Sequence, residues 1–204
     1  MSQLNLFDKV SNNAEITHIQ NGEYLFIPFF FSLEQSDNYF DKLLTEINWK
    51  QESMYMYGRN INFPRLTAWY GDNDKPYSFS GITLKPETWT QALLEIKQHI
   101  EAIAQAKYNS VLLNRYRNGN DSISWHTDAE KELGINPIIA SVNLGATRKF
   151  QLRHNETNEK IELALTHGSL LIMQGELQHY WQHQVPKTKQ QVNERINLTF
   201  RLIK

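Results

Sequence analysis

The chain has 204 residues, of which 40% are hydrophobic, and its 21 basic and 22 acidic side chains leave a formal net charge of −1. This length can bury the core of one sizeable domain, and the near-zero charge argues against a partner held by the field of the whole molecule. The chain has no cysteine. A disulfide framework, a thiolate nucleophile, an iron–sulfur cluster and a cysteine zinc site are therefore excluded, and any metal must be held by histidine and carboxylate groups.

The chain shows no internal boundary and no membrane segment. No linker, low-complexity tract or repeat divides it, so we expect a single domain over residues 1–204. The first residues lack a basic start followed by an apolar core, and the longest apolar stretch, residues 24–31, is far shorter than the ~20 residues of a membrane span. We expect a soluble, cytoplasmic chain with no membrane partner.

Two helices are predicted in the first half of the chain. Ser32 and Gln35 have the spacing of a capping box, and the apolar residues that roughly trace one face after it are Leu33, Tyr39, Phe40, Leu43, Leu44 and Ile47. The second helix follows Pro86, and its apolar residues recur at steps of four and three: Trp89, Leu93, Ile96, Ile100 and Ile103. Both helices are expected to cover a sheet.

Short strands separated by turn residues are predicted for the second half. The expected strands are Val111–Arg117, Ser122–Asp128, Ile138–Leu144, Lys149–His154, Ile161–Leu165, Ser169–Met173, His179–Val185 and Ile196–Ile203. This number and spacing of strands predicts a mainly β member of the α+β class, a double-stranded β-helix (jelly roll) with N-terminal helices packed on one sheet.

An H-x-D motif is a candidate metal site. His126 and Asp128 are two residues apart, and in a strand such side chains leave the same face. A late histidine, either His179 or His183, would complete the two-histidine, one-carboxylate triad of non-haem Fe(II) oxygenases. Most isolated H-x-D pairs are ordinary surface or turn residues, so the motif alone leaves both interpretations open.

The C-terminal strand has two distinct faces. Polar residues alternate with apolar ones from Arg195 to Arg201, which places Arg195, Asn197, Thr199 and Arg201 on one side. Two guanidiniums on one face suit a dicarboxylate bound lengthwise. A solvated edge strand is the alternative that this segment alone favours.

Two further regions are ambiguous from the sequence. Asn114 and Tyr116 share a strand face and either offer an amide and a hydroxyl to a cavity or form a satisfied buried pair. The aromatic, glycine-containing region from Trp69 to Gly81 is either a mobile lid that stacks on a planar ligand or ordinary core.

Six segments in order resemble the AlkB-like Fe(II)/2-oxoglutarate dioxygenases, which are nucleic-acid dealkylases. They are FPRLTAWYGD with YSFSGITL, LLNRYRNGNDSISWHTDAEKELG, PIIASVNLGATRKFQLRH, LTHGSLLIMQG, WQHQVPK and RINLTFR, and they cover Phe63 to Arg201. They look most like the branch that acts on alkylated DNA. The resemblance implies an N-terminal extension at residues 1–62, followed by a nucleotide lid and jelly-roll core at residues 63–204.

The resemblance also implies roles for individual residues. Iron ligation is implied for His126, Asp128 and His183, with His183 preferred over His179 because it precedes Val185-Pro186. The implied 2-oxoglutarate site consists of Asn114, Tyr116, Arg195, Thr199 and Arg201, with Asn197 as a neighbour. The positions implied around an extruded base are Tyr77, Phe79, Ser80 and Glu130, and Tyr57 matches an intercalating position.

The implied activity is oxidative demethylation of 1-methyladenine and 3-methylcytosine in DNA. Fe(II), 2-oxoglutarate and O2 would be required, and succinate, CO2 and formaldehyde would be released. Ala129 stands where repair members commonly have a second acid, which puts the lesion preference in question.

Two other functions remain open at this point. One is an oxygenase that acts on RNA, a protein or a small molecule, and the other is a non-catalytic jelly-roll binding module. We expect a monomer with no protein partner. The basic groups expected near phosphates are Arg59, Arg65, Arg148, Arg153, Lys187 and Lys189.

Overall fold

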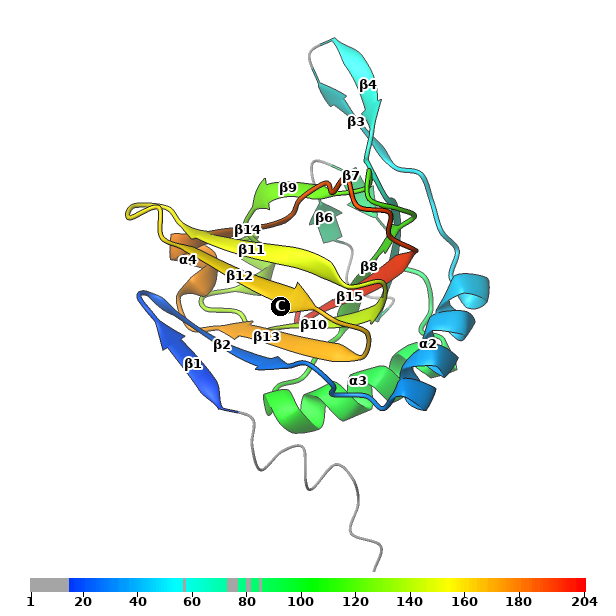
Figure 1. Ribbon diagram of the computed structural model, residues 1–204, viewed down its shortest axis with the longest axis horizontal. Helices are drawn as coiled ribbons and strands as arrows, with labels where there is room; N and C mark the ends of the chain where they lie inside the picture. The colour runs from blue at the N-terminus through cyan, green and yellow to red at the C-terminus, as the bar shows by residue number, and fades with distance from the viewer. Residues whose placement is uncertain (1–14, 57, 73–76, 80–81, 85) are drawn as a thin grey trace, which may run out of the picture.

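Two antiparallel β-sheets face each other in the computed structural model, which describes residues 15–56, 58–72, 77–79, 82–84 and 86–204 (Figure 1). The larger sheet has seven strands, in the order β1 (Ile16–Ile19), β2 (Gly22–Ile27), β13 (Ser169–Gln174), β10 (Ile139–Gly145), β15 (Arg195–Arg201), β8 (Ser110–Tyr116) and β5 (Leu66–Gly71). The smaller sheet has four, in the order β12 (Lys160–Leu165), β11 (Arg148–His154), β14 (Trp181–Val185) and β9 (Ile123–His126). This arrangement confirms the predicted jelly roll.

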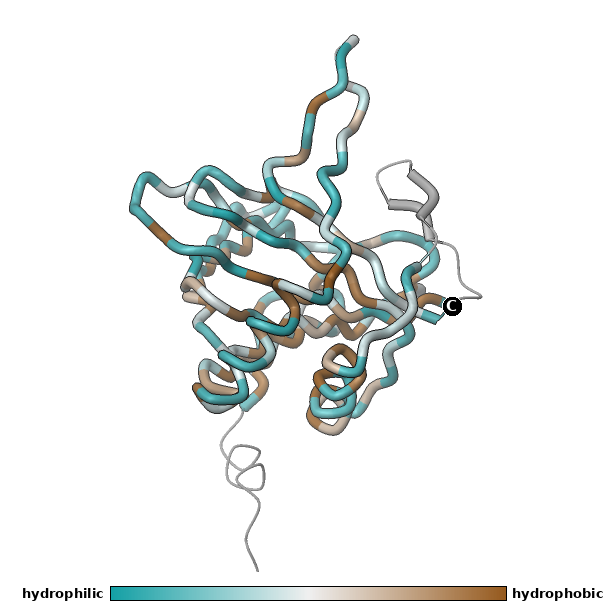
Figure 2. The backbone as a smooth tube through the Cα atoms, turned by 90° about the vertical axis from the view of Figure 1, so that its right-hand side faces the viewer, coloured by the Kyte–Doolittle hydropathy of each residue, from teal (hydrophilic) through white to brown (hydrophobic). Residues whose placement is uncertain are grey.

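Two helices pack on the larger sheet. Helix α2 (Leu33–Glu46) begins with the predicted capping box of Ser32 and Gln35, and α3 (Gln91–Ala104) is capped by the side chain of Thr90. Their apolar residues join β-strand residues in one core cluster, and Figure 2 shows hydrophobic and hydrophilic segments alternating along both helices. Leu33 departs from the predicted face, because it is the first helical residue and is 72% exposed.

A second apolar cluster lies between the two sheets. It joins inward-facing residues of β10 and β13 with residues of β11 and β14, and Trp181 is buried at its centre. The strands that meet there alternate apolar and polar side chains, so polar groups of β8 and β15 also face this interior.

All eight strands predicted after residue 110 are present, but three boundaries are off by two residues. The last strand, β15, ends at Arg201 and not at Ile203. Strand β9 ends at His126, so Asp128 lies in the following loop and does not share a strand face with it. The strand predicted from His179 begins only at Trp181, because the short helix α4 (Leu177–Tyr180) precedes it. The backbone N–H groups of His179 and Tyr180 both donate to the carbonyl of Glu176.

The strands of the first half were not predicted, and three of them belong to the larger sheet. Strands β1 and β2 extend the larger sheet, and β5 forms its other edge. Trp69 and Tyr70 lie in β5 and are each only 4% exposed, so they belong to the core and not to a lid.

Two hairpins stand apart from the main sheets. The hairpin of β3 (Ser53–Met56) and β4 (Arg59–Asn62) projects from the body (Figure 1), and β6 (Tyr77–Phe79) pairs with β7 (Ile82–Leu84). A 3₁₀ helix, η1 (Lys131–Leu133), follows β9. No helix of the described residues has the length and apolar character needed to cross a bilayer.

Candidate active site

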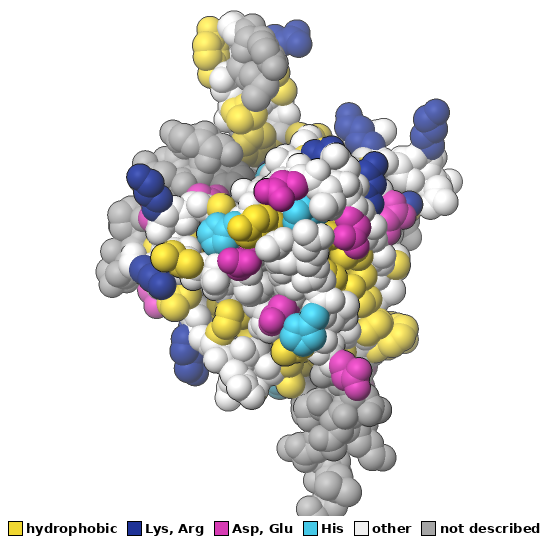
Figure 3. Space-filling model, turned by 90° about the vertical axis from the view of Figure 1, so that its left-hand side faces the viewer, with side chains coloured by type: hydrophobic (Ala, Val, Ile, Leu, Met, Phe, Trp, Pro, Cys, Tyr) yellow, Lys and Arg dark blue, Asp and Glu magenta, His cyan; other side chains and the backbone are white. Residues whose placement is uncertain are grey.

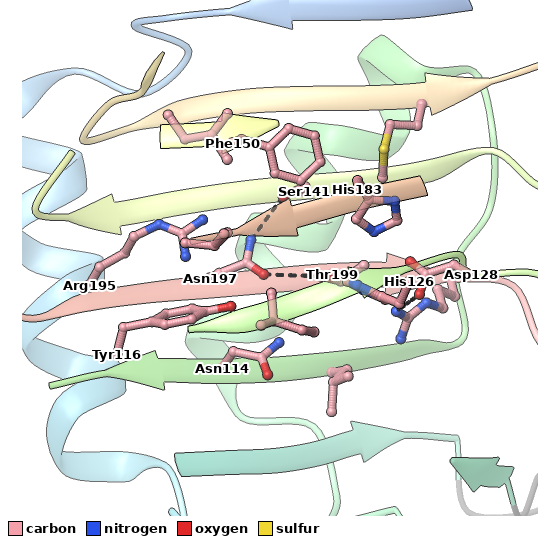
Figure 4. A pocket seen from close by; sticks show the side chains of 16 residues that line it. Asn114, Tyr116, His126, Asp128, Ser141, Phe150, His183, Arg195, Asn197 and Thr199 are labelled. Carbon is pink, nitrogen blue, oxygen red and sulfur yellow. Dashed lines mark hydrogen bonds and ion pairs between the residues drawn. The ribbon is translucent and has the colours of Figure 1, made fainter. Parts of the chain in front are cut away.

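A pocket between the two sheets is lined by buried polar side chains (Figure 4). A carboxylate and two imidazoles lie at one end, and a guanidinium lies at the other. The polar lining residues are Asn114, Tyr116, His126, Asp128, Ser141, His183, Arg195, Asn197, Thr199 and Arg201.

Three possible metal ligands meet at one end of this pocket. His126 ends β9, Asp128 lies in the loop that follows, and His183 lies on β14 directly opposite His126. One ligand atom from each residue can be chosen so that all three lie within 4.8 Å of one another. Two imidazole nitrogens and a carboxylate oxygen are the donor set of the facial triad that binds Fe(II).

Hydrogen bonding and burial leave both imidazoles able to bind a metal. Nδ1 of His126 lies 2.8 Å from the carbonyl oxygen of Ser124, which can only accept, so Nδ1 carries the proton and Nε2 keeps its lone pair. Burial and the neighbouring His126 lower the pKa of His183 to about 3. His183 is therefore neutral at physiological pH, which is the form that binds metals.

Asp128 is held by a side chain from each of two other elements. Nη2 of Arg201 donates to Oδ1 of Asp128 over 2.8 Å, and the backbone N–H of Asp128 donates to Oε1 of Gln178 over 2.9 Å. Burial raises the pKa of Asp128, but Arg201 and the two histidines more than offset this and hold it well below its usual range. The carboxylate is therefore charged and fixed in place.

Arg195 marks the other end of the pocket. Its guanidinium lies over the ring of Tyr116, 4.8 Å from the centroid, and Nη2 donates to Oδ1 of Asn143 over 2.5 Å. Its Nε and Nη1 are buried without a hydrogen-bond partner among the described residues. Burial lowers the pKa of Arg195, partly opposed by Tyr116, but a guanidinium stays charged. Each of these two nitrogens can donate a charge-assisted hydrogen bond to an anionic group.

Polar side chains line the space between the two ends. Asn197 lies opposite Asn114 on β8 and opposite Asn143 on β10, because β15 is central in the sheet. The edge-strand alternative for this segment is therefore wrong. Thr199 donates through Oγ1 to Oδ1 of Asn197 over 3.2 Å, and Arg65 donates through Nε to Oδ1 of Asn114 over 2.7 Å.

The buried charges of the described residues do not balance. Four arginines and two aspartates are buried: Arg65, Arg148, Arg195, Arg201, Asp121 and Asp128. Of these, only Arg195, Arg201 and Asp128 line the pocket, and Asp128 pairs with Arg201. The charge of Arg195 is left for an anion in the pocket, because buried charges need partners.

Comparison with known proteins places the chain in a family. A sequence profile of the 2OG-Fe(II) oxygenase superfamily matches residues 23–201. The chain belongs to this superfamily. Its sequence is 43% identical over 186 residues to the cattle protein named alpha-ketoglutarate-dependent dioxygenase alkB homolog 3, covering 86% of this chain and 64% of that protein. It is 36% identical to the human DNA oxidative demethylase ALKBH2, covering 85% of this chain and 70% of that protein.

These likenesses confirm the predicted resemblance to AlkB-like proteins. The chain spans a little less than two thirds of the alkB homolog 3 protein it matches. Solved structures share the oxygenase fold: one described as the structure of OsALKBH1 has a TM-score of 0.63 at 19% identity, and covers 92% of this chain and 100% of that one. A prolyl hydroxylase from Trichoplax adhaerens has a TM-score of 0.60 at 15% identity, covering 96% of this chain and 89% of that one.

The pocket fits the two groups that a 2OG-Fe(II) oxygenase uses. The donor set of His126, Asp128 and His183 suits Fe(II). The unpartnered nitrogens and the uncompensated charge of Arg195 suit a carboxylate of 2-oxoglutarate. The donor set and the carboxylate-binding end therefore occupy one cavity.

The remaining predicted site residues differ in their outcome: some are located by the structure, and others lie outside its described residues. His179 is exposed and contacts Asn136, away from the pocket, so of the two candidates only His183 joins the ligand group. Glu130 is half-buried, and its Oε2 is buried without a partner among the described residues. Tyr77 and Phe79 lie in β6, but their side chains are outside the described part of the chain, as are Ser80 and Tyr57.

Two arginines expected at phosphates are part of the interior. Arg65 is 5% exposed, and its guanidinium is bound to Asn114 and the carbonyl of Ser122. Arg148 is 3% exposed and donates to the carbonyl oxygens of Asn118, Asp121 and Pro186. These contacts hold the loops beside the pocket and keep both guanidiniums in the interior.

Gln178 was not predicted as a site residue, although its side chain accepts a hydrogen bond from the backbone N–H of Asp128. The signal that could have found it is weak: a glutamine between two predicted strands, five residues before His183. Met173 was not predicted either, although it lines the pocket from β13. Met173 reads as an ordinary core residue in the run Ser169–Gln174.

Proposed function

We propose that this chain is an Fe(II)- and 2-oxoglutarate-dependent dioxygenase that removes methyl groups from nucleobases in alkylated DNA, such as 1-methyladenine and 3-methylcytosine. The observation that carries this proposal is one pocket with a His-Asp-His group at one end and a carboxylate-binding arginine at the other. Its support for DNA comes from relatives named DNA oxidative demethylase, such as the human protein at 36% identity, and the cattle alkB homolog 3 protein at 43% supports the dioxygenase chemistry.

In this proposal the metal is held by His126, Asp128 and His183. The residues proposed to bind 2-oxoglutarate are Asn114, Tyr116, Arg195, Asn197, Thr199 and Arg201. Arg195 would take the distal carboxylate through Nη1, which has no partner among the described residues. Iron with bound 2-oxoglutarate would activate O2, one atom of which would enter succinate as CO2 leaves, while the other would hydroxylate an N-methyl group that is then lost as formaldehyde.

The contribution of the chain to this chemistry is positioning. The Ser124 carbonyl fixes the tautomer of His126, while Arg201 fixes the carboxylate of Asp128 and Gln178 fixes its backbone N–H. Burial of the polar lining excludes water and strengthens its electrostatic interactions. Arg195 orients the cosubstrate lengthwise, so that its other end meets the three ligands.

Glu130 is the proposed acceptor for the exocyclic amine of the damaged base. Its Oε2 is buried without a partner among the described residues, and it follows Asp128 by two residues. Because the intervening Ala129 carries no carboxylate, Glu130 would accept this hydrogen bond alone. Tyr57, Tyr77, Phe79 and Ser80 remain the proposed contacts around the base.

Binding to DNA would depend on local contacts. On the face in Figure 3, basic, acidic and histidine side chains are interspersed and do not form one basic patch. With a net charge of −1, we propose that the chain contacts few phosphates and loses affinity steeply with salt. We further propose a cytoplasmic monomer with one domain over residues 1–204, since β2 of the N-terminal extension pairs with β13 of the core.

Product analysis across substrate classes tests this function. Methylated DNA, the same sequence as RNA, and free methylated nucleosides are incubated with protein, Fe(II), ascorbate and 2-oxoglutarate, and formaldehyde and the restored base are measured. We expect restoration of DNA at a rate that depends on 2-oxoglutarate and is lost in Asp128→Ala. A higher rate of succinate formation on RNA than on DNA would identify RNA as the preferred substrate. No succinate with any substrate would favour the binding module.

A further inference from the structure

A methionine sulfur lies inside the pocket that would generate the oxidant. Met173 lines the same pocket as the three possible metal ligands and is 2% exposed. Thioethers are readily oxidised to sulfoxides, and the chain has no cysteine that would compete for oxidation. The aliphatic and aromatic side chains of the pocket offer only C–H or ring positions, which are harder to oxidise than a sulfur lone pair.

Met173 is also two hydrogen bonds away from the carboxylate ligand. Its Sδ accepts from Nε2 of Gln178 over 3.7 Å, and Oε1 of the same side chain accepts from the backbone N–H of Asp128 over 2.9 Å. All three residues are buried, so no water competes for these contacts. A change at the sulfur is therefore transmitted to the loop that carries Asp128.

We propose that Met173 is a self-oxidation site, converted to methionine sulfoxide when the enzyme turns over without a nucleobase in place. This inference rests on the proposed function, because the oxidant comes from that reaction. One molecule of O2 and one of 2-oxoglutarate are consumed. One oxygen atom enters succinate as CO2 leaves, and the other bonds to the sulfur. The sulfur and the 2-oxoglutarate each give up two electrons, and O2 accepts all four.

The sulfoxide would change the site that produced it. It turns a flexible apolar side chain into a polar one with a strong acceptor oxygen, within a closely packed interior. Gln178 must then move or bond to the new oxygen, and its contact with Asp128 is disturbed. Turnover without substrate would thus slow the enzyme.

Met54 supplies an internal comparison within the same chain. It lies on the projecting β3–β4 hairpin, is half-buried and does not line the pocket. Peroxide that diffuses through solution oxidises accessible methionines first, so it would modify Met54 before Met173. An oxidant formed in the pocket reverses this order.

Peptide mass spectrometry tests the inference. The full chain is incubated with Fe(II), 2-oxoglutarate, O2 and catalase, with and without methylated DNA, and succinate is measured in the same samples. We expect the mass gain of one oxygen atom on Met173, proportional to succinate formed and several-fold greater than on Met54. The gain should require 2-oxoglutarate, fall when methylated DNA is present, disappear when the digest is treated with methionine sulfoxide reductases, and be absent from Met173→Leu.

The outcomes separate this inference from the proposed function. Succinate without oxygen on Met173, or with equal oxidation of Met54, would overturn the inference and leave the oxygenase function intact. No succinate under any condition would overturn the proposed function and the inference together.

Discussion

Arg201 and Asp128 form a buried ion pair that joins the two sheets. Nη2 of Arg201, at the end of β15 in the larger sheet, lies 2.8 Å from Oδ1 of Asp128, in the loop that follows β9 of the smaller sheet. Both side chains are almost fully buried. The pair therefore fixes the position of the carboxylate ligand relative to the strand that carries both pocket arginines.

Removing the cation should destabilise the metal-free protein strongly. Arg201→Met leaves a buried carboxylate without its partner, and such changes cost about 3–5 kcal/mol. Arg115→Met is a matched control, because the Arg115–Glu194 pair is partly exposed and should cost at most about 1 kcal/mol. Urea unfolding in the presence of a chelator measures both. An equal loss in the two variants would contradict the importance of the buried pair.

The pH dependence of this loss has a definite sign. In the wild type the pKa of Asp128 is depressed, so its stabilising contribution is present above the unfolded pKa of about 3.9 and is lost as the pH falls through the folded value. In Arg201→Met, burial dominates and raises the pKa, so the penalty grows as the pH rises above about 3.9. The difference in unfolding free energy between the two proteins should therefore shrink between pH 7 and pH 4. A constant difference would argue against this account.

Arg195 should determine the affinity for 2-oxoglutarate. Its two unpartnered nitrogens can make two charge-assisted hydrogen bonds, each worth about 1.5–3 kcal/mol. Arg195→Gln is expected to raise the KM for 2-oxoglutarate by at least about tenfold, and a high concentration should restore much of the rate. Initial rates of succinate formation measure this. An unchanged KM would remove Arg195 from the cosubstrate site.

Arg65 should orient Asn114 and should not contact DNA. Because Nε of Arg65 donates a hydrogen bond to Oδ1 of Asn114, the amide nitrogen of Asn114 remains as the donor toward the pocket. Arg65→Met frees this amide to rotate, so we expect a higher KM for 2-oxoglutarate with unchanged salt dependence of DNA binding. Arg153 lies on β11 of the smaller sheet and does not line the pocket, so Arg153→Met is the control that should leave the KM for 2-oxoglutarate unaltered. A change in the salt dependence for Arg65→Met would contradict its interior role.

Gln178 should affect metal binding through the backbone of Asp128. Gln178→Leu leaves the buried N–H of Asp128 without an acceptor, whereas Gln178→Glu retains an acceptor oxygen. Weaker binding of Mn(II) is expected for Gln178→Leu, with partial recovery in Gln178→Glu. Gln184→Leu, on β14, is the control. Calorimetric titration with Mn(II) distinguishes them, and equal affinity of Gln178→Leu and the wild type would rule out this role.

Local sequence patterns were sufficient for the strands after residue 110 and for the capped helix. Alternation from Arg195 to Arg201 predicted which side chains share a face, because the two-residue period of a strand is a local property. Whether that strand is an edge or a central one depends on pairing with β8 and β10, far away in the chain. The segment alone therefore favoured the wrong alternative.

The supporting contacts of the site could not be predicted for the same reason. Gln178 lies 50 residues from the amide of Asp128 that it binds, and Arg65 lies 49 residues from Asn114. No local pattern marks either pair. Arg65 and Arg148, two of the arginines predicted at phosphates, had ordinary sequence surroundings, and only the packing of the loops places them in the interior.

The most direct test of the central claim, that one pocket holds Fe(II) and 2-oxoglutarate together, is an anaerobic absorption titration. Fe(II) is added to the protein without O2, and 2-oxoglutarate is then titrated while the visible spectrum is recorded. We predict a charge-transfer band that requires both components, is lost in Asp128→Ala and needs more 2-oxoglutarate in Arg195→Gln. No band at saturating concentrations, or an unchanged band in Asp128→Ala, would contradict the account.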